Sequence, residues 1–171
     1  APTDLIFEAG KFAATTYTVE VFRDPQGYWD LYIDGARVGA SSVKDTTYWS
    51  WRYVVMDNRT GTAQKDWDNF VVKQLALSGE LRDFFDDNDY TADPVWAVQS
   101  GGWSAAGGEL VTSSANGIIS SDLGALKDCS GFVYLKAKFR IDSGGSLEDI
   151  QFGINTAADA TGDGYQIQLH Y

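Results

Sequence analysis

The stretch FVYLKAKFRI, residues 132–141, alternates apolar residues with polar or charged ones at a period of two. Successive side chains of an extended strand point to opposite faces of its sheet, so this pattern predicts a strand with one buried face. The face that we expect to be buried carries Val133, Leu135, Ala137, Phe139 and Ile141. The face that we expect to meet water carries Tyr134, Lys136, Lys138 and Arg140.

Strands of the same kind are predicted along the rest of the chain. They span residues 16–22, 28–33, 51–56, 69–75, 149–155 and 165–171. Turn sequences separate them, including Asp-Pro-Gln-Gly at 24–27, Asp-Gly at 34–35 and several glycine pairs after residue 100. Residues 77–85 fit either a short helix or a connection, and no segment sustains a 3.6-residue period. The sequence therefore predicts an all-β protein, an antiparallel β-sandwich or jelly roll.

Composition narrows the classes of function. A length of 171 residues is typical of one domain, and a net charge of -11 disfavours nucleic acid as a partner. No apolar run is long enough to cross a bilayer. Cys129 and His170 are the single residues of their kinds, which excludes an intrachain disulfide and a Cys/His zinc cluster. The opening Ala-Pro in place of Met fits either a processed secreted protein or an excised fragment, and we expect an extracellular location.

Two halves of the chain resemble the two halves of one known module, in exchanged order. YTVEVFRDPQGYWDLYIDG (17–35) and DWDNFVV (66–72) resemble the closing half of a laminin-G-like or concanavalin A-like jelly-roll module of bacterial secreted proteins. FFDDNDYTADPVWAVQSGGWSAAGGELV (84–111), GFVYLKAKFRID (131–142) and GDGYQIQL (162–169) resemble the opening half. The resemblance implies that residues 1–80 and 81–171 are complementary parts of one sandwich.

That order leaves two arrangements open. The chain is either a circular permutant that folds into one jelly roll, or each half is completed by a neighbouring subunit. Completion by a neighbour would make the protein a subunit of a self-assembling fibre or tandem array through strand exchange.

The resemblance also implies a structural calcium site where the two halves meet. In the module, an acidic residue of the last strand lies beside an acidic opening motif, and the corresponding residues here are Asp68, Asp86 and Asp87. Calcium needs six to eight oxygen ligands, for which Asp66, Asn69 and Asp89 are the expected supplements. The second motif reads Asp-Asp-Asn where the family has Asp-Asp-Phe, and the alternative is a solvated acidic turn.

A carbohydrate groove on the curved outer face of one sheet is the second candidate site, because aromatic rings and planar amides bind sugars. The candidate ligand-binding residues are Tyr134, Gln166, Gln168 and His170, with Lys136, Lys138, Gln151 and Asn155 as polar neighbours. Trp49 and Trp51 are two residues apart and form a possible sugar platform, although paired tryptophans more often pack in a core.

Hydrolysis of sugars is not expected. The retaining glucanases of this fold carry Glu-x-Asp-x-x-Glu, whereas Glu148 and Asp149 are adjacent here and would point to opposite faces. We therefore expect a non-catalytic extracellular module for adhesion, surface architecture or carbohydrate binding, with a glycoside hydrolase of the same fold as the alternative.

Overall fold

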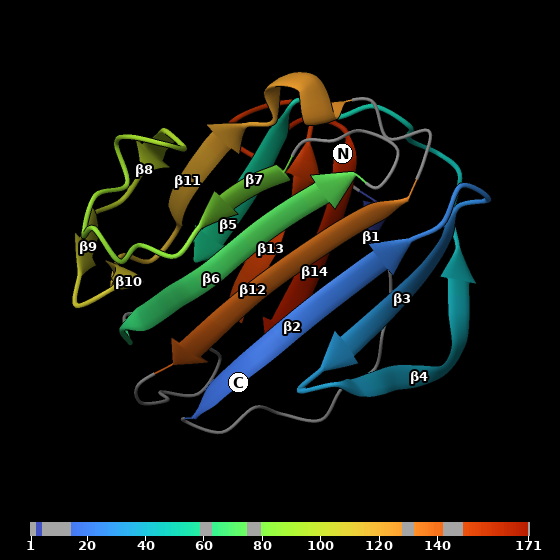
Figure 1. Cartoon of the computed structure of the whole chain (residues 1–171), viewed down its shortest axis with the longest axis horizontal. Helices are drawn as coiled ribbons and strands as arrows, with labels where there is room; N and C mark the ends of the chain where they lie inside the picture. The colour runs from blue at the N-terminus through green and yellow to red at the C-terminus, as the bar shows by residue number, and fades with distance from the viewer. Residues whose placement is uncertain are drawn as a thin grey trace.

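The computed structural model describes residues 3–4, 15–58, 63–74, 80–127, 132–141 and 149–170. Their strands form two sheets, which lie in two layers (Figure 1). One sheet has six strands in the order β1 (Thr3–Asp4), β14 (Gly164–His170), β13 (Asp149–Asn155), β5 (Tyr53–Asn58), β11 (Gly117–Asp122) and β8 (Trp96–Ser100). The other has eight, in the order β4 (Ala36–Lys44), β3 (Tyr28–Ile33), β2 (Thr16–Arg23), β12 (Val133–Ile141), β6 (Lys65–Gln74), β10 (Glu109–Thr112) and β9 (Trp103–Ala106), with β7 (Glu80–Asp83) beside β6. The prediction of an all-β sandwich is confirmed.

Strand β12 has the two faces that its sequence predicts. Its inward side chains are all buried: Val133, Leu135, Ala137, Phe139 and Ile141 are at most 3% exposed. They join residues of both sheets in one hydrophobic cluster, while the alternate side chains of β12 are half-buried on the outer face. Because β12 also pairs with β2 on one side and with β6 on the other, it is a central strand of its sheet.

The two halves of the chain alternate within both sheets. Strand β12, from the second half, pairs with β2 on one side and with β6 on the other, both from the first half. Strand β5, from the first half, pairs with β13 and β11. The last strand, β14, pairs with β13 of its own chain. Among the described residues, the core is therefore shared between the halves, and neither half forms a sheet alone.

Residues 77–85 do not form a helix where the structure describes them, so that alternative is wrong. Strand β7 occupies Glu80–Asp83 and pairs antiparallel with β6, which places Leu81 in the core. A hydrogen-bonded edge of β6 is available there, and pairing with it outweighs the weak local preference for a helix. The single helical element in the described part is a short 3-10 turn, η1 (Gly124–Lys127). No described helix has the length and apolar character needed to cross a bilayer.

The predicted turns lie where expected. Asp34 and Gly35 have φ angles of 49° and 78°, and they join β3 to β4 in a tight hairpin. Both central residues of this turn type need positive φ, which explains the Asp-Gly pair. Between β2 and β3, the Gly27 amide donates to the Asp24 carbonyl at 3.0 Å, as the Asp-Pro-Gln-Gly sequence predicts.

Candidate functional site

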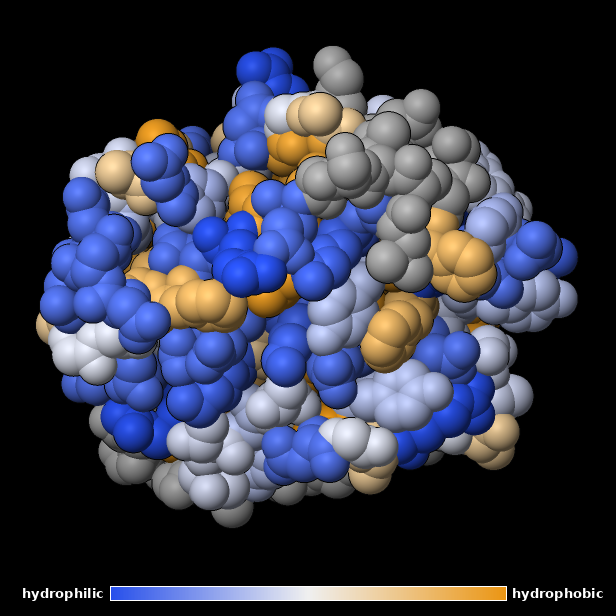
Figure 2. Space-filling view, viewed as in Figure 1, coloured by the Kyte–Doolittle hydropathy of each residue, from blue (hydrophilic) through white to orange (hydrophobic). Residues whose placement is uncertain are grey.

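Exposed and half-buried aromatic rings gather on the outer face of the eight-stranded sheet. By strand alternation these side chains point away from the core residues Val21 and Leu31. Figure 2 views the molecule from this side and shows small hydrophobic spots on a mainly hydrophilic surface. We call the set the aromatic face, and its members are Phe22, Tyr28, Tyr32, Phe132 and Tyr134.

Phe22 is the centre of the aromatic face. Its ring centroid lies 4.8 Å from that of Tyr134 and 5.6 Å from that of Tyr32. Phe22 pairs with Tyr134 across the β2–β12 ladder, so the sheet register sets this contact. The Phe22 side chain is nevertheless 39% exposed, and Tyr28 and Phe132 are 41% and 47% exposed. Packing of the rings against each other fixes their orientation while leaving apolar surface in contact with water.

Polar groups flank these rings on both sides. The Tyr134 hydroxyl donates to Glu20 at 2.7 Å. Burial, together with that hydrogen bond, raises the pKa of Tyr134 above its ordinary value. Asp30, opposite Phe22 on β3, accepts from Arg37 Nε at 2.9 Å and from Ser42 at 3.0 Å. Donors and acceptors are thus held in place beside an apolar ring.

The predicted carbohydrate residues lie on different sheets. Tyr134 belongs to the aromatic face, whereas Gln166 and Gln168 are on β14 and face outward from the six-stranded sheet. His170 ends β14, and its side chain is outside the described residues, as is Cys129. The sequence could not separate these positions, because period-two alternation shows that a residue faces outward but not from which sheet.

At the centre of the six-stranded sheet, several outward side chains are polar but buried. Gln166 and Gln151 are 5% and 2% exposed, and Asp57, which pairs with Gln151 across the ladder, is 6% exposed. The Gln151 side-chain oxygen has no hydrogen-bond partner among the described residues. Side chains with so little exposed surface offer less room for a ligand than the aromatic face does.

Trp49 and Trp51 have unlike environments. Trp51 is 1% exposed and packs in the core against Trp29, whereas Trp49 is 38% exposed. The buried Arg23 guanidinium lies 3.9 Å above the Trp49 ring and 5.6 Å from that of Trp51. This pair of tryptophans therefore encloses a cation of the protein itself.

The predicted calcium ligands on β6 are engaged by cations of β12. Asp68 accepts from Lys138 at 2.9 Å, and Asp66 accepts from Arg140 at 2.5 Å. These two cations of β12 compensate the like charges along β6. In the described ranges, no three His, Cys, Asp or Glu side chains are grouped so that they could hold one.

The remaining predicted ligands belong to the turn after β7. The Asp87 carboxylate accepts from the Asp89 amide, and Asp89 accepts from the amide and hydroxyl of Thr91, which lower the pKa of Asp89. These bonds close local turns, as Asp commonly does. Asp86, Asp87 and the buried Asp83 line a small pocket of about 250 Å³. The five predicted aspartates are thus split between two places, and the calcium site stays a prediction.

Asp83 was not foreseen as a structural carboxylate. It accepts from the Trp96 indole at 2.8 Å and from the Phe85 amide at 2.8 Å. Burial raises its pKa, and Asp87 and Asp89 act in the same direction. Asp83 and Trp96 are 13 residues apart in the sequence, and no local sequence pattern predicts their contact.

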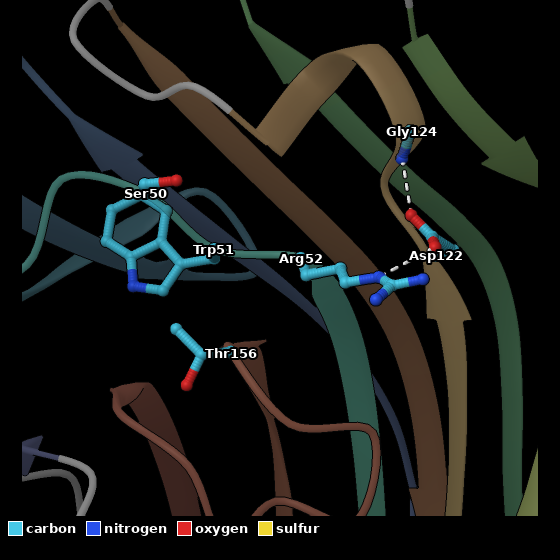
Figure 3. A pocket seen from close by; sticks show the side chains of 6 residues that line it. All are labelled: Ser50, Trp51, Arg52, Asp122, Gly124 and Thr156. Atoms are coloured by element: carbon cyan, nitrogen blue, oxygen red, sulfur yellow. Dashed lines mark hydrogen bonds and ion pairs between the residues drawn. The ribbon is translucent and has the colours of Figure 1, made fainter.

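A larger pocket, with a volume of about 430 Å³, lies where β5 begins and where β11 and β13 end (Figure 3). Backbone hydrogen bonds join these ends: the Arg52 amide donates to Asn155 at 3.0 Å, and the Leu123 amide donates to Arg52 at 2.7 Å. The lining residues are Ser50, Trp51, Arg52, Asp122, Gly124 and Thr156. They come from three distant parts of the sequence, so no local motif could have predicted this site.

Comparisons with known proteins leave the family of this chain open. No protein-family model matches it, and a search of curated proteins gives no match. The function is therefore inferred from the residues and their geometry.

Proposed function

We propose that this domain is a non-catalytic carbohydrate-binding module that acts outside the cell, in adhesion or surface architecture, and that the aromatic face is its binding surface. The observation that supports this proposal most directly is the exposed Phe22 ring, which packs between Tyr32 and Tyr134 on the outer face of the sheet.

The chemistry of a sugar supports this choice of ligand. A pyranose ring has a face of C–H groups, which packs on an aromatic ring, and a rim of hydroxyl groups, which need hydrogen-bond partners. The aromatic face offers both, because Phe22 supplies apolar surface while Glu20 and Asp30 supply fixed acceptors beside it. Tyr134 adds a neutral hydroxyl.

Electrostatics also favour a neutral ligand on this surface. The chain carries a formal charge of -11, which repels phosphate-rich and strongly acidic polymers. Neutral polysaccharides are not subject to this repulsion. A long, flat polymer also suits a sheet face better than an enclosed small molecule would.

The test is binding to a panel of neutral polysaccharides, by calorimetry for soluble ones and by pull-down for insoluble ones. Loss of an aromatic anchor typically costs about 2 kcal/mol, so Phe22→Ala should weaken binding roughly 30-fold. Tyr134→Phe keeps the ring and removes its bond to Glu20, and should weaken binding by less, about 5-fold.

Two controls separate this surface from others. Val98→Ala changes an equally exposed apolar residue on the other sheet and should leave binding unchanged. Trp49→Ala tests the other exposed aromatic that the sequence singled out. Saturable binding that Trp49→Ala abolishes and Phe22→Ala spares would place the sugar elsewhere, and an absence of binding across the panel would refute the proposal.

A further inference from the structure

The exposed Phe22 ring is surrounded by acidic residues on the sheet surface. Glu20 lies two residues before Phe22 on β2, and Asp24 lies two residues after it, just past the end of the strand. Side chains two residues apart on a strand share a face. Across the two neighbouring ladders, Phe22 pairs with Asp30 of β3 and with Tyr134 of β12. Three of the four positions next to Phe22 are therefore carboxylates.

One oxygen of Asp30 is fixed by hydrogen bonds. Asp30 Oδ1 accepts from Arg37 Nε at 2.9 Å, from Arg37 Nη2 at 2.5 Å and from Ser42 Oγ at 3.0 Å. Within the described residues, Asp30 Oδ2 accepts no hydrogen bond, and the side chain is 28% exposed. The carboxylate is thus held by one oxygen and offers the other as an acceptor beside Phe22.

Glu20 and Asp24 repeat this arrangement. Glu20 Oε1 accepts from the Tyr134 hydroxyl at 2.7 Å, and Asp24 Oδ1 accepts from the amides of Gln26 and Tyr28, both at 2.9 Å. The second oxygen of each carboxylate accepts no hydrogen bond from the part of the chain that the structure describes. The Tyr134 hydroxyl uses its only proton on Glu20, so it too can only accept from a ligand. The groups around the central ring are thus acceptors, and we call the following four residues the acceptor rim: Glu20, Asp24, Asp30 and Tyr134.

The cations of this surface lie one position further from Phe22. Arg37 is bound to Asp30, and Lys44 Nζ lies 5.0 Å from the centroid of the Tyr28 ring. Lys136 is opposite Glu20 in the ladder between β2 and β12. These three cations offset the charge of the three carboxylates, so the surface favours a neutral sugar over a cationic one.

We propose that the acceptor rim makes the aromatic face selective for sugars with free hydroxyl groups and against O-acetylated sugars, an inference that rests on the proposed binding of a polysaccharide there. A sugar hydroxyl can donate a hydrogen bond to a carboxylate, whereas an acetyl ester has no proton to donate and presents a carbonyl acceptor. Acetylation therefore removes the bond and leaves the carboxylate oxygen facing another acceptor. Glu20 and Asp30 are the residues that determine this specificity.

The test compares one polysaccharide with and without acetyl groups, by calorimetry on the intact domain. The probe is the soluble neutral polysaccharide that binds best in the panel described above, before and after partial O-acetylation with acetic anhydride. The acetylated form should bind at least about 10-fold more weakly, because charge-assisted hydrogen bonds are lost. Removal of the acetyl esters with mild alkali should restore the original affinity, which controls for other changes to the polymer.

Substitution of the two carboxylates by amides tests which residues read the hydroxyl groups. Glu20→Gln and Asp30→Asn keep the shape of the side chain and one fixed oxygen, and they replace the second oxygen by an NH₂ donor that an acetyl carbonyl can accept from. The ratio between the two affinities should fall from about 10-fold to below about 3-fold in the double variant. Glu109→Gln is the matched control, because Glu109 is on β10 of the same sheet and should leave the ratio unchanged.

The outcomes separate this inference from the proposed function. An absence of binding by every unmodified polysaccharide would refute both. Equal binding of the acetylated and unmodified forms, with both lost in Phe22→Ala, would refute the selectivity alone. A ratio that the double variant leaves unchanged, even if both affinities fall, would show that Glu20 and Asp30 have only a structural role.

Discussion

Replacement of Leu135 by alanine tests whether the two halves of the chain form one cooperative core. Leu135 is fully buried on β12, the strand from the second half that lies between β2 and β6 of the first. Loss of three carbon atoms removes about 2.4 kcal/mol of transfer free energy, at roughly 0.8 kcal/mol for each CH₂ group. The cavity left behind brings the expected cost to about 3–4 kcal/mol.

The effect should be large on the scale of the whole domain. Single domains unfold at a cost of about 5–15 kcal/mol, so the variant should lose a substantial part of its stability. For a chain of this size the Tm should fall by about 6–16 °C. Urea unfolding followed in parallel by tryptophan fluorescence and far-ultraviolet circular dichroism measures the loss, and hydrogen exchange locates it.

The reasoning predicts one transition and equal loss of exchange protection in β2, β6 and β12. Lys136→Ala, at the next residue on the outer face, is the matched control and should cost less than about 1 kcal/mol. Two separate transitions, or loss of protection in β12 alone, would show that the halves are independent. A cost below about 1 kcal/mol for Leu135→Ala itself would refute the central position of β12.

Three further predictions concern turns, titration and metal. Gly35→Ala should cost about 1 kcal/mol in urea unfolding, because the backbone there has a φ of 78°, although no described atom beyond the adjacent residues lies within 4 Å of an added Cβ. Burial and the hydrogen bond to Asp45 raise the pKa of Tyr165 to about 12. The contribution of the Tyr165 hydroxyl to stability is therefore complete below pH 10 and is lost as the pH rises to 12. Tyr165→Phe should remove that part of the pH dependence of the free energy of unfolding. Asp68→Ala should lower the free energy of unfolding by up to about 1 kcal/mol in the presence of a chelator, because the carboxylate pairs with Lys138.

Each of these three predictions has an outcome that would contradict it. An unchanged stability for Gly35→Ala would mean that the β3–β4 turn has another backbone conformation. The same loss of stability between pH 10 and 12 in Tyr165→Phe would assign that loss to other groups. An unchanged stability for Asp68→Ala in chelator would contradict the contribution of the ion pair with Lys138, and a chelator that lowers the Tm of the unaltered domain but not of Asp68→Ala would establish Asp68 as a calcium ligand.

Several features were predictable from local sequence because they depend on local chemistry. The alternation at residues 133–141 specified which side chains of β12 are buried, since the period of a strand is set by its backbone. The Asp34-Gly35 pair specified a hairpin, since few residues tolerate positive φ. The aromatic face was within reach of the same reasoning, because Phe22 and Tyr32 lie opposite the core positions of their own strands.

Other features were decided by contacts between distant segments. Strand β7 formed at a sequence with weak preferences, because the edge of β6 offered it hydrogen-bond partners. The pairing of Asp68 with Lys138 depends on the register between β6 and β12, and the Arg52 pocket on the meeting of three strand ends. Period-two alternation in the sequence predicts whether a side chain faces inward or outward. The order of the strands in the sheet determines which outward side chains become neighbours. That order is set by long-range hydrogen bonds and by burial of a shared core.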